Sequence, residues 1–235
     1  MIDWKIQFYY DRGIDSVFIH KLFYFLVSKG AQYNCKHEGY YQIFPKSQKK
    51  PVTIENIELS HMEKEVKCTT EKLAEIIDSY LKFDIKDTIL GVHLDFFGEA
   101  NFLFNTTIYP VKDNKLIVYL QTNLYEISDE KSFLTFVNLC KELFVKFSFI
   151  YGQSRSQYEG IIPTDIDEFL KERPNIVNFY SRPLVDKIGR EKLLSTPAFK
   201  VEELENGGVM LIVCTEPLGC DNIYEVWRHL GYKSL

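Results

Sequence analysis

The chain has 235 residues, of which 46% are apolar and 26% charged, and its formal net charge is −5. These proportions are ordinary for a globular protein and allow one large domain or two small ones. The acidic balance, without a continuous basic stripe, disfavours nucleic-acid binding. No run reaches the roughly 18 apolar residues that a membrane-spanning helix needs, so we expect no membrane partner.

The N-terminus and the cysteines indicate the compartment. Residues Met1 to Lys5 lack the charged start, apolar run and small-residue cleavage site of a signal peptide. The five cysteines are Cys35, Cys68, Cys140, Cys214 and Cys220. They are odd in number and contain no Cys-x-x-Cys pair, which indicates neither a disulfide framework nor a zinc knuckle. Reduced thiols and a cytoplasmic location are therefore expected.

The first third of the chain predicts a strand and a helix. Ile6 to Tyr10 has the composition of a strand. Asp15 or Ser16 can cap a helix that runs to about Lys29 and that Gly30 ends. Apolar residues follow each other at helical spacing in this segment, so one face of the helix is expected to be buried.

The middle of the chain predicts a helix followed by three strands. Thr69 or Thr70 can cap the helix, which carries an apolar stripe. Three β-rich runs then follow, namely Thr88 to Phe97, Asn101 to Tyr109 and Leu116 to Tyr125. Because only short turn signals separate these runs, they indicate an antiparallel meander.

A long helix and a polar segment come next. Ser128 or Asp129 opens the helix, whose aromatic stripe can pack across the sheet. A short strand over Ser148 to Tyr151 can follow it. The segment Gly152 to Gly160 is polar and predicts a mobile loop or a boundary between two halves of the chain.

The C-terminal third predicts short elements. Ile176 to Tyr180 has the pattern of a strand. Phe199 to Leu204 and Val209 to Cys214 flank Asn206-Gly207, which is a strong hairpin signal because both residues accept positive φ. A final helix begins near Asn222 and ends at Gly231.

This order of elements predicts the α+β class, with one or more antiparallel β-sheets and packed helices. The 18 Phe and 15 Tyr residues also favour sheets with well-filled faces. We expect a single domain over residues 1–235. Within it, residues 1–151 and 161–235 are candidates for two similar halves that the polar loop joins.

Charge is one-sided between Val201 and Trp227, a stretch with six acidic residues and no Lys or Arg. The remainder of the chain therefore sums to about +1. With Tyr224 and Trp227, these acids predict a face that binds a protein with a basic surface, because charge complementarity speeds association. Solvated side chains of a hairpin and a helix are the alternative. The acids are Glu202, Glu203, Glu205, Glu216, Asp221 and Glu225.

The polar segment supplies a second set of candidate binding residues. Tyr151, Arg155 and Tyr158 lie in or next to it. Tyr and Arg are favoured anchors of protein interfaces, so a recognition loop is one interpretation. An ordinary surface connection is the other.

Signals for catalysis are weak. His93 and Asp95 share one face of a predicted strand and are candidates for a metal site in a small hydrolase or phosphodiesterase, although a solvated strand face is our preferred interpretation. Cys214 lies in an apolar run and Cys220 lies beside acids, so neither has the electropositive setting of a nucleophile. No Gly-x-Ser-x-Gly, Walker or dinucleotide motif occurs. We expect no catalytic residue, no metal and no cofactor.

Residues 175–221 carry the resemblance of this chain to known sequences. The matching stretches are Asn178-Phe-Tyr-Ser-Arg-Pro-Leu-Val-Asp-Lys-Ile-Gly189, Leu194-Ser-Thr-Pro197, Val201-Glu-Glu-Leu204, Gly207-Gly-Val-Met-Leu211 and Pro217-Leu-Gly219. They resemble the polymorphic-toxin immunity 52 family and the type VI secretion immunity family. The resemblance implies a non-catalytic bacterial protein that binds and neutralises a cognate toxin, usually one encoded next to it. An accessory subunit of another bacterial defence system is the alternative.

Overall fold

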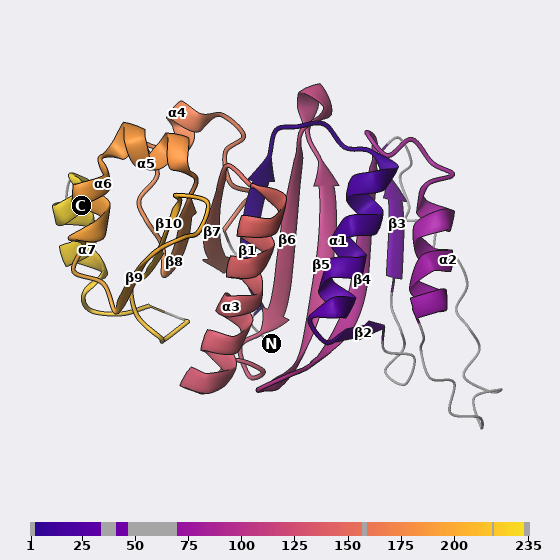
Figure 1. Cartoon of the computed structure of the whole chain (residues 1–235), viewed down its shortest axis with the longest axis horizontal. Helices are drawn as coiled ribbons and strands as arrows, with labels where there is room; N and C mark the ends of the chain where they lie inside the picture. The colour runs from indigo at the N-terminus through magenta and orange to yellow at the C-terminus, as the bar shows by residue number, and fades with distance from the viewer. Residues whose placement is uncertain (1–2, 34–40, 47–69, 157–158, 218, 233–235) are drawn as a thin grey trace.

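A computed structural model describes residues 3–33, 41–46, 70–156, 159–217 and 219–232 of the chain. Sequence predictions that involve Cys35, Cys68, Thr69 and Tyr158 lie outside these residues. The described residues form a broad, twisted β-sheet with helices packed on it (Figure 1).

Ten strands of the described residues form a single sheet. Their order is β2-β4-β5-β6-β1-β7-β8-β10-β9, and β3 also pairs with β4. Each of these pairings is antiparallel, which confirms the α+β class and the predicted meander of β4, β5 and β6. The strands are β1 (Asp3–Tyr10), β2 (Ala31–Tyr33), β3 (Tyr41–Pro45), β4 (Thr88–Phe97), β5 (Asn101–Pro110), β6 (Leu116–Asn123), β7 (Tyr151–Ser156), β8 (Val177–Tyr180), β9 (Lys200–Glu203) and β10 (Val209–Ile212).

Seven α-helices of the described residues pack around this sheet. They are α1 (Ser16–Ser28), α2 (Thr70–Tyr80), α3 (Glu130–Phe147), α4 (Ile166–Phe169), α5 (Arg182–Ile188), α6 (Arg190–Leu194) and α7 (Ile223–Leu230). Figure 1 shows α1 and α3 in front of the long strands and α2 at the edge of the sheet beside β3, whereas α4 to α7 gather at the end formed by β8, β9 and β10. Within the described part of the chain, no helix combines the length and apolarity that crossing a membrane requires.

Local capping interactions explain where the main helices begin and end. The Asp15 carboxylate accepts a hydrogen bond of 2.7 Å from the Phe18 amide, and Asp129 accepts one of 2.9 Å from the Ser132 amide. After α7, Gly231 adopts φ 90°, a left-handed conformation that favours glycine. The predicted starts of α1 and α3 and the predicted end of α7 are confirmed.

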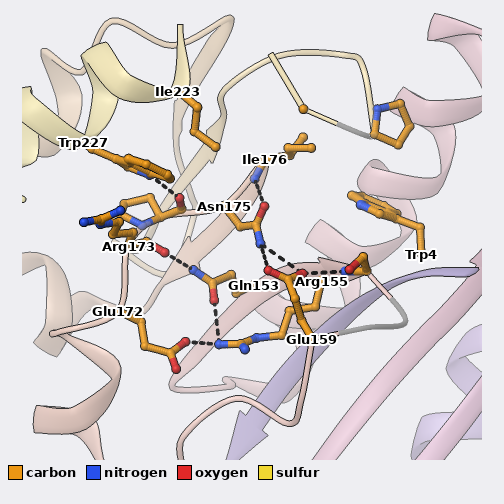
Figure 2. Close-up of a pocket in the computed structure, with 14 residues that line it drawn as sticks. Trp4, Gln153, Arg155, Glu159, Glu172, Arg173, Asn175, Ile176, Ile223 and Trp227 are labelled. Atoms are coloured by element: carbon orange, nitrogen blue, oxygen red, sulfur yellow. Dashed lines mark hydrogen bonds and ion pairs between the residues drawn. The ribbon is translucent and has the colours of Figure 1, made fainter. Parts of the chain in front are cut away.

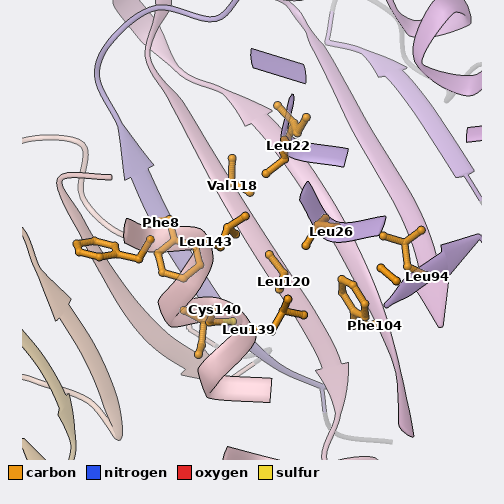
Figure 3. Packing of buried hydrophobic residues seen from close by; sticks show 14 of the residues in the cluster. Phe8, Leu22, Leu26, Leu94, Phe104, Val118, Leu120, Leu139, Cys140 and Leu143 are labelled. Atoms are coloured by element: carbon orange, nitrogen blue, oxygen red, sulfur yellow. The ribbon is translucent and has the colours of Figure 1, made fainter. Parts of the chain in front are cut away.

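One core lies between the helices α1 to α3 and the facing side of the sheet. Strand alternation directs Phe8 and Val118 to this side, where they meet Leu22 of α1 and Leu143 of α3 (Figure 3). These four side chains are fully buried. The Phe8 ring also stacks on Phe149 at 5.1 Å between ring centroids, so aromatic packing holds β1 against the end of α3.

A second core lies on the opposite side of the sheet. Tyr9 and Tyr180 point to this side because they follow Phe8 and Phe179, which belong to the first core. They pack with Val185 of α5, Leu193 of α6 and Val226 of α7. Both faces of the sheet are therefore covered at its C-terminal end. Every residue of the short strands β8 and β10 is buried as a result.

The prediction of a loop over Gly152 to Gly160 is wrong for residues 152–156, which continue the strand that begins at Tyr151. Tyr151 and these residues form β7, which pairs with β1 on one side and with β8 on the other. Gln153, Ser154 and Arg155 are buried there in spite of their polarity, because side chains and backbone groups from distant segments bond to them. The sheet consequently continues through β7 from the strands before residue 151 into those after residue 161.

The close packing of β7 on β1 makes Gly152 sensitive to added volume. A Cβ atom there would collide with the Phe8 ring and would lie 3.2 Å from the Gln7 carbonyl. We expect Gly152→Ala to lower the free energy of unfolding by about 1–3 kcal/mol in urea denaturation. Gly160→Ala is the matched control, since nothing lies within 4 Å of a Cβ there, and its effect should stay below about 0.5 kcal/mol. Equal effects of the two substitutions would contradict this packing.

Candidate functional site

A cleft of about 540 Å³ opens at the junction between β7, the segment before β8 and the loop that leads into α7 (Figure 2). Its lining includes Trp4 and Trp227, which are the two tryptophans of the whole chain. Arg155, Glu159 and Asn175 are among its polar side chains. The cleft is thus built from segments at the start, middle and end of the sequence.

Helix α7 supplies one wall of the cleft. Ile223 and Trp227 are four residues apart, so they lie on the same face of the helix. The Trp227 indole nitrogen Nε1 donates a 2.7 Å hydrogen bond to the Pro174 carbonyl, and the Arg173 guanidinium lies 4.8 Å from the Trp227 ring centroid. Tyr224 meets Trp227 edge to face at 5.1 Å. These contacts fix the indole at the mouth of the cleft.

Strand β7 supplies the floor. Gln153 and Arg155 lie two residues apart and therefore face the same side of the sheet. Gln153 Nε2 donates to the Arg173 carbonyl at 2.9 Å and to Asn178 Oδ1 at 3.2 Å. Gln153 Oε1 accepts a 3.1 Å hydrogen bond from Arg155 Nη2. One amide side chain thus ties β7, β8 and the segment before β8 together.

Arg155 is the most buried charge of the cleft, with 9% of its surface exposed. Its guanidinium forms an ion pair with Glu172. Burial lowers the pKa of Arg155, and the charge of Glu159 acts in the opposite direction. An arginine side chain remains protonated under ordinary conditions, so the cleft keeps a buried, paired positive charge.

Glu159 differs from Glu172 in the partners of its carboxylate. It is exposed, and its oxygens accept hydrogen bonds from the Ser156 amide at 2.6 Å and from Asn175 Nδ2 at 3.2 and 3.5 Å. These donors are neutral. Among the described residues, no cationic group lies within ion-pair distance of Glu159.

The structure brings together two residues from the two predicted candidate sets. Arg155 of the polar segment and Trp227 of the acidic stretch line the same cleft. Tyr151 is placed differently, because it is fully buried and stacks on Phe169 with 3.7 Å between ring centroids. Burial raises the pKa of Tyr151 far above its ordinary value, as expected for a core phenol. Tyr151 therefore belongs to the second core.

The six acids of the C-terminal stretch fall into two groups. Glu202, Glu203 and Glu205 belong to the β9–β10 hairpin, and the others belong to the loop before α7 and to α7 itself. Basic side chains from other parts of the sequence or the same strand lie next to two of the hairpin acids. Glu202 pairs with Lys141 at 3.0 Å and with Lys200 at 2.7 Å, and Glu203 pairs with Arg190.

The second acidic group lies close to the cleft. Glu216 and Asp221 flank the segment whose Pro217 and Gly219 line the cleft, and both are exposed. They form an acidic rim beside the cleft, a term we use for these two residues. Glu225 is also exposed, but it is two residues from both Ile223 and Trp227 and so lies on the opposite face of α7.

His93 and Asp95 lie on the side of β4 that faces away from the first core. Burial lowers the pKa of His93, which favours the neutral imidazole. The described residues contain no group of three His, Cys, Asp or Glu side chains that could hold a metal ion. The two residues on their own do not make a complete ligand set.

The expectation of reduced thiols is wrong for Cys214 and Cys220. The chain turns back after β10 and brings their Cα atoms to 6.1 Å, where the two residues form a disulfide. The bond closes the loop that carries Glu216, Pro217 and Gly219. Cys140 is a free thiol in the first core, and burial raises its pKa.

Several cleft residues have no sequence signal of their own. Glu159, Glu172, Arg173 and Asn175 lie in polar segments that resemble ordinary surface connections. Trp4 stands out in the sequence only as one of the two tryptophans of the chain. Its neighbours in the cleft lie about 150 or more residues away in sequence, beyond the reach of local patterns.

No known protein family and no curated protein matches the sequence of this chain. Among solved structures, the chain is similar to the Pseudomonas aeruginosa T6SS protein PA0821, with a TM-score of 0.52 and 10% identity over 98% of this chain and 72% of that one. At such low identity the likeness shows a shared fold. A likeness with a TM-score of 0.37 and 15% identity covers 67% of this chain and 88% of a chain in the complex of the toxic C-terminal tip of CdiA from P. aeruginosa with an immune protein.

The bonds of Gln153 predict the effect of removing its amide. Gln153→Leu keeps the volume but leaves the Arg173 carbonyl, in a half-buried residue, without this donor and removes one acceptor from Arg155. We expect the free energy of unfolding to fall by about 1–3 kcal/mol in urea denaturation. The control Gln121→Leu removes a single bond to Asp3 at a half-buried site and should cost less than about 1 kcal/mol. A smaller loss for Gln153 than for Gln121 would contradict the role of this amide.

The ion pairs of Glu202 predict a dependence of stability on pH. Burial raises the pKa of Glu202, but hydrogen bonds from Lys200 and Lys141 outweigh it and hold this pKa below its ordinary value of 4.5. A lowered pKa adds stability above pH 4.5, and this contribution is lost as the pH falls through the folded-state value.

We expect Glu202→Gln to lower the free energy of unfolding by about 1 kcal/mol at neutral pH, and the difference from the unmodified protein to vanish towards about pH 3. Denaturation curves at several pH values measure this. The control is Glu205→Gln at an exposed position of the same hairpin, for which the difference should be near zero throughout. A difference for Glu202→Gln that stays constant with pH would refute the assignment.

Proposed function

We propose that this chain is an immunity protein, a non-catalytic bacterial protein that binds and neutralises a cognate protein toxin. The observation that carries the proposal is the cleft, whose lining combines Trp227 of α7 with Arg155 of β7. Trp, Tyr and Arg are the residues that most often dominate the binding energy of protein interfaces. Their side chains are held in place before binding, which reduces the entropic cost of association.

The charges around the cleft support a partner with a basic surface. Glu216 and Asp221 are exposed beside it, and Tyr224 projects from helix α7 with 56% of its surface exposed. Complementary charge increases the association rate and selects the partner. The hairpin acids Glu202 and Glu203 contribute less to this field, since basic side chains pair with them.

The comparisons support the proposal at the level of the fold. The structure that shares it over 98% of this chain is described as a T6SS protein of P. aeruginosa. No family model matches residues 175–221, so the proposal does not rest on their resemblance to immunity families. The shared fold does not identify the toxin, which we expect to be encoded next to this chain.

The Cys214–Cys220 bond bears on where the protein acts. Disulfides persist in oxidising compartments and are rare in the cytosol. The thiol state of this pair in cells therefore separates the expected cytoplasmic location from an extracytoplasmic one. Mass spectrometry after alkylation of free thiols reads that state directly.

The proposal predicts that exposed residues at the mouth of the cleft contribute to toxin binding. We expect a stoichiometric complex with the toxin encoded by the neighbouring gene and protection of cells that co-express the two proteins. Tyr224→Ala should weaken the complex about tenfold or more in isothermal titration calorimetry, because it removes an exposed aromatic side chain that contacts Trp227.

The matched control is Tyr125→Ala, which removes a tyrosine with 78% of its surface exposed in the turn between β6 and α3. It should change affinity less than about twofold. Failure of the unmodified protein to bind and to protect would reject the immunity function. Equal effects of the two tyrosine substitutions would remove the cleft from the interface.

A further inference from the structure

The carboxylate of Glu159 has a fixed orientation in the cleft and can accept further hydrogen bonds. The Ser156 amide and Asn175 Nδ2 hold its carboxylate in one orientation. A carboxylate has about four acceptor positions, so further donors can approach. Because both donors are uncharged, they orient the group without neutralising it.

The side of the cleft near Glu159 carries apolar surface. Figure 2 shows Trp4, Ile176 and Ile223 around the upper part of the cleft and Glu159 below them, next to Asn175. Apolar walls that lead to a carboxylate fit a side chain with an aliphatic stem and a cationic head. Arginine and lysine have this form, since they bury the stem and place the charge at its end.

The arginines of the cleft are already engaged with other groups. Arg155 is paired with Glu172, and Arg173 lies over the ring of Trp227. Figure 2 shows Arg173 beside Trp227, away from Glu159. Glu159 is therefore the carboxylate of the lining that forms no ion pair among the described residues, so an incoming cation can pair with it.

The surroundings of the cleft favour a cation as well. Lys5 is a cation that the charge of Glu159 influences: burial and the charge of Arg155 lower the pKa of Lys5, and the charge of Glu159 acts in the opposite direction. Within the described part of the chain Lys5 forms no ion pair with Glu159, and its ammonium group lies 5.6 Å from the Tyr119 ring centroid. Glu216 and Asp221 flank the wall residue Pro217 and add negative potential at the entrance. Such a field attracts positive side chains and repels carboxylates.

We infer that the cleft is a socket for an arginine or lysine side chain of the partner protein, with Glu159 as its counter-charge and Trp4, Ile176 and Ile223 along its stem. The inference rests on the proposed function, which supplies a protein partner, and it names the chemistry of one contact. It assigns to Glu159 a binding role that is separate from the structural role of Glu172.

Short peptides test this chemistry without the toxin. The probes are acetyl-Gly-Arg-Gly-amide and its lysine analogue, with the citrulline analogue as a neutral match for arginine. Nuclear magnetic resonance of the full chain reports binding through the indole N–H signals, of which Trp4 and Trp227 supply the only two. We expect saturable shifts with both cationic peptides in the millimolar range and none with citrulline.

Variants separate the socket from general attraction to an acidic protein. Glu159→Gln should weaken peptide binding about tenfold or more, whereas Glu168→Gln, an exposed acid outside the cleft lining, should leave it unchanged. Unchanged indole signals in the absence of peptide confirm that each variant is folded. Equal shifts with citrulline, no shift with either cationic peptide at about 20 mM, or full binding by Glu159→Gln would overturn the inference.

The outcome is distinguishable from that of the proposed function. If the toxin binds and protects as expected but the peptides give no shift, the cationic socket is rejected and the immunity function stands. If the peptides bind through Glu159 while the neighbouring toxin neither binds nor is neutralised, the socket stands and the immunity function is rejected.

Discussion

Strand β7 is the link on which the rest of the structure depends, because it pairs with β1 on one side and with β8 on the other. A strand in this position must bury whatever side chains it carries. Here these include Gln153, Ser154 and Arg155, and an unsatisfied buried polar group costs about 1–3 kcal/mol. Hydrogen bonds to Asn178 and to the Val177 amide, together with the Glu172 ion pair, offset that cost.

The same polar strand creates the cleft. Gln153 of β7 donates a hydrogen bond to the Arg173 carbonyl and so fixes the segment before β8. The next residue of that segment, Pro174, accepts a hydrogen bond from the Trp227 indole. Burial of Trp4 at the start of β1 closes the other side. The hydrogen bonds of β7 that join two parts of the sheet therefore also fix the side chains that we propose to bind a partner. Binding then needs little reorganisation of the cleft.

Local interactions made most of the fold predictable from the sequence. The caps Asp15 and Asp129 and the alternation of β4 act over a few residues, so the predicted boundaries agree with the structure. Strand β7 was missed because its polar side chains bond to residues such as Asn178 and Glu172, which the local pattern does not show. The partners of Glu202 and the bond between Cys214 and Cys220 likewise follow from the fold, as does the presence of Trp4 and Trp227 in the lining of one cleft.

Hydrogen–deuterium exchange of the chain with and without the toxin encoded beside it tests the central claim most directly. The account predicts slower exchange on binding at the backbone amides of residues 172–176 and of the segment from Pro217 to Trp227, which surround the cleft. Exchange at the backbone amides of β4 and β5 should not change. A stable complex whose protection lies on β4 and β5, with exchange around the cleft unaltered, would contradict the account.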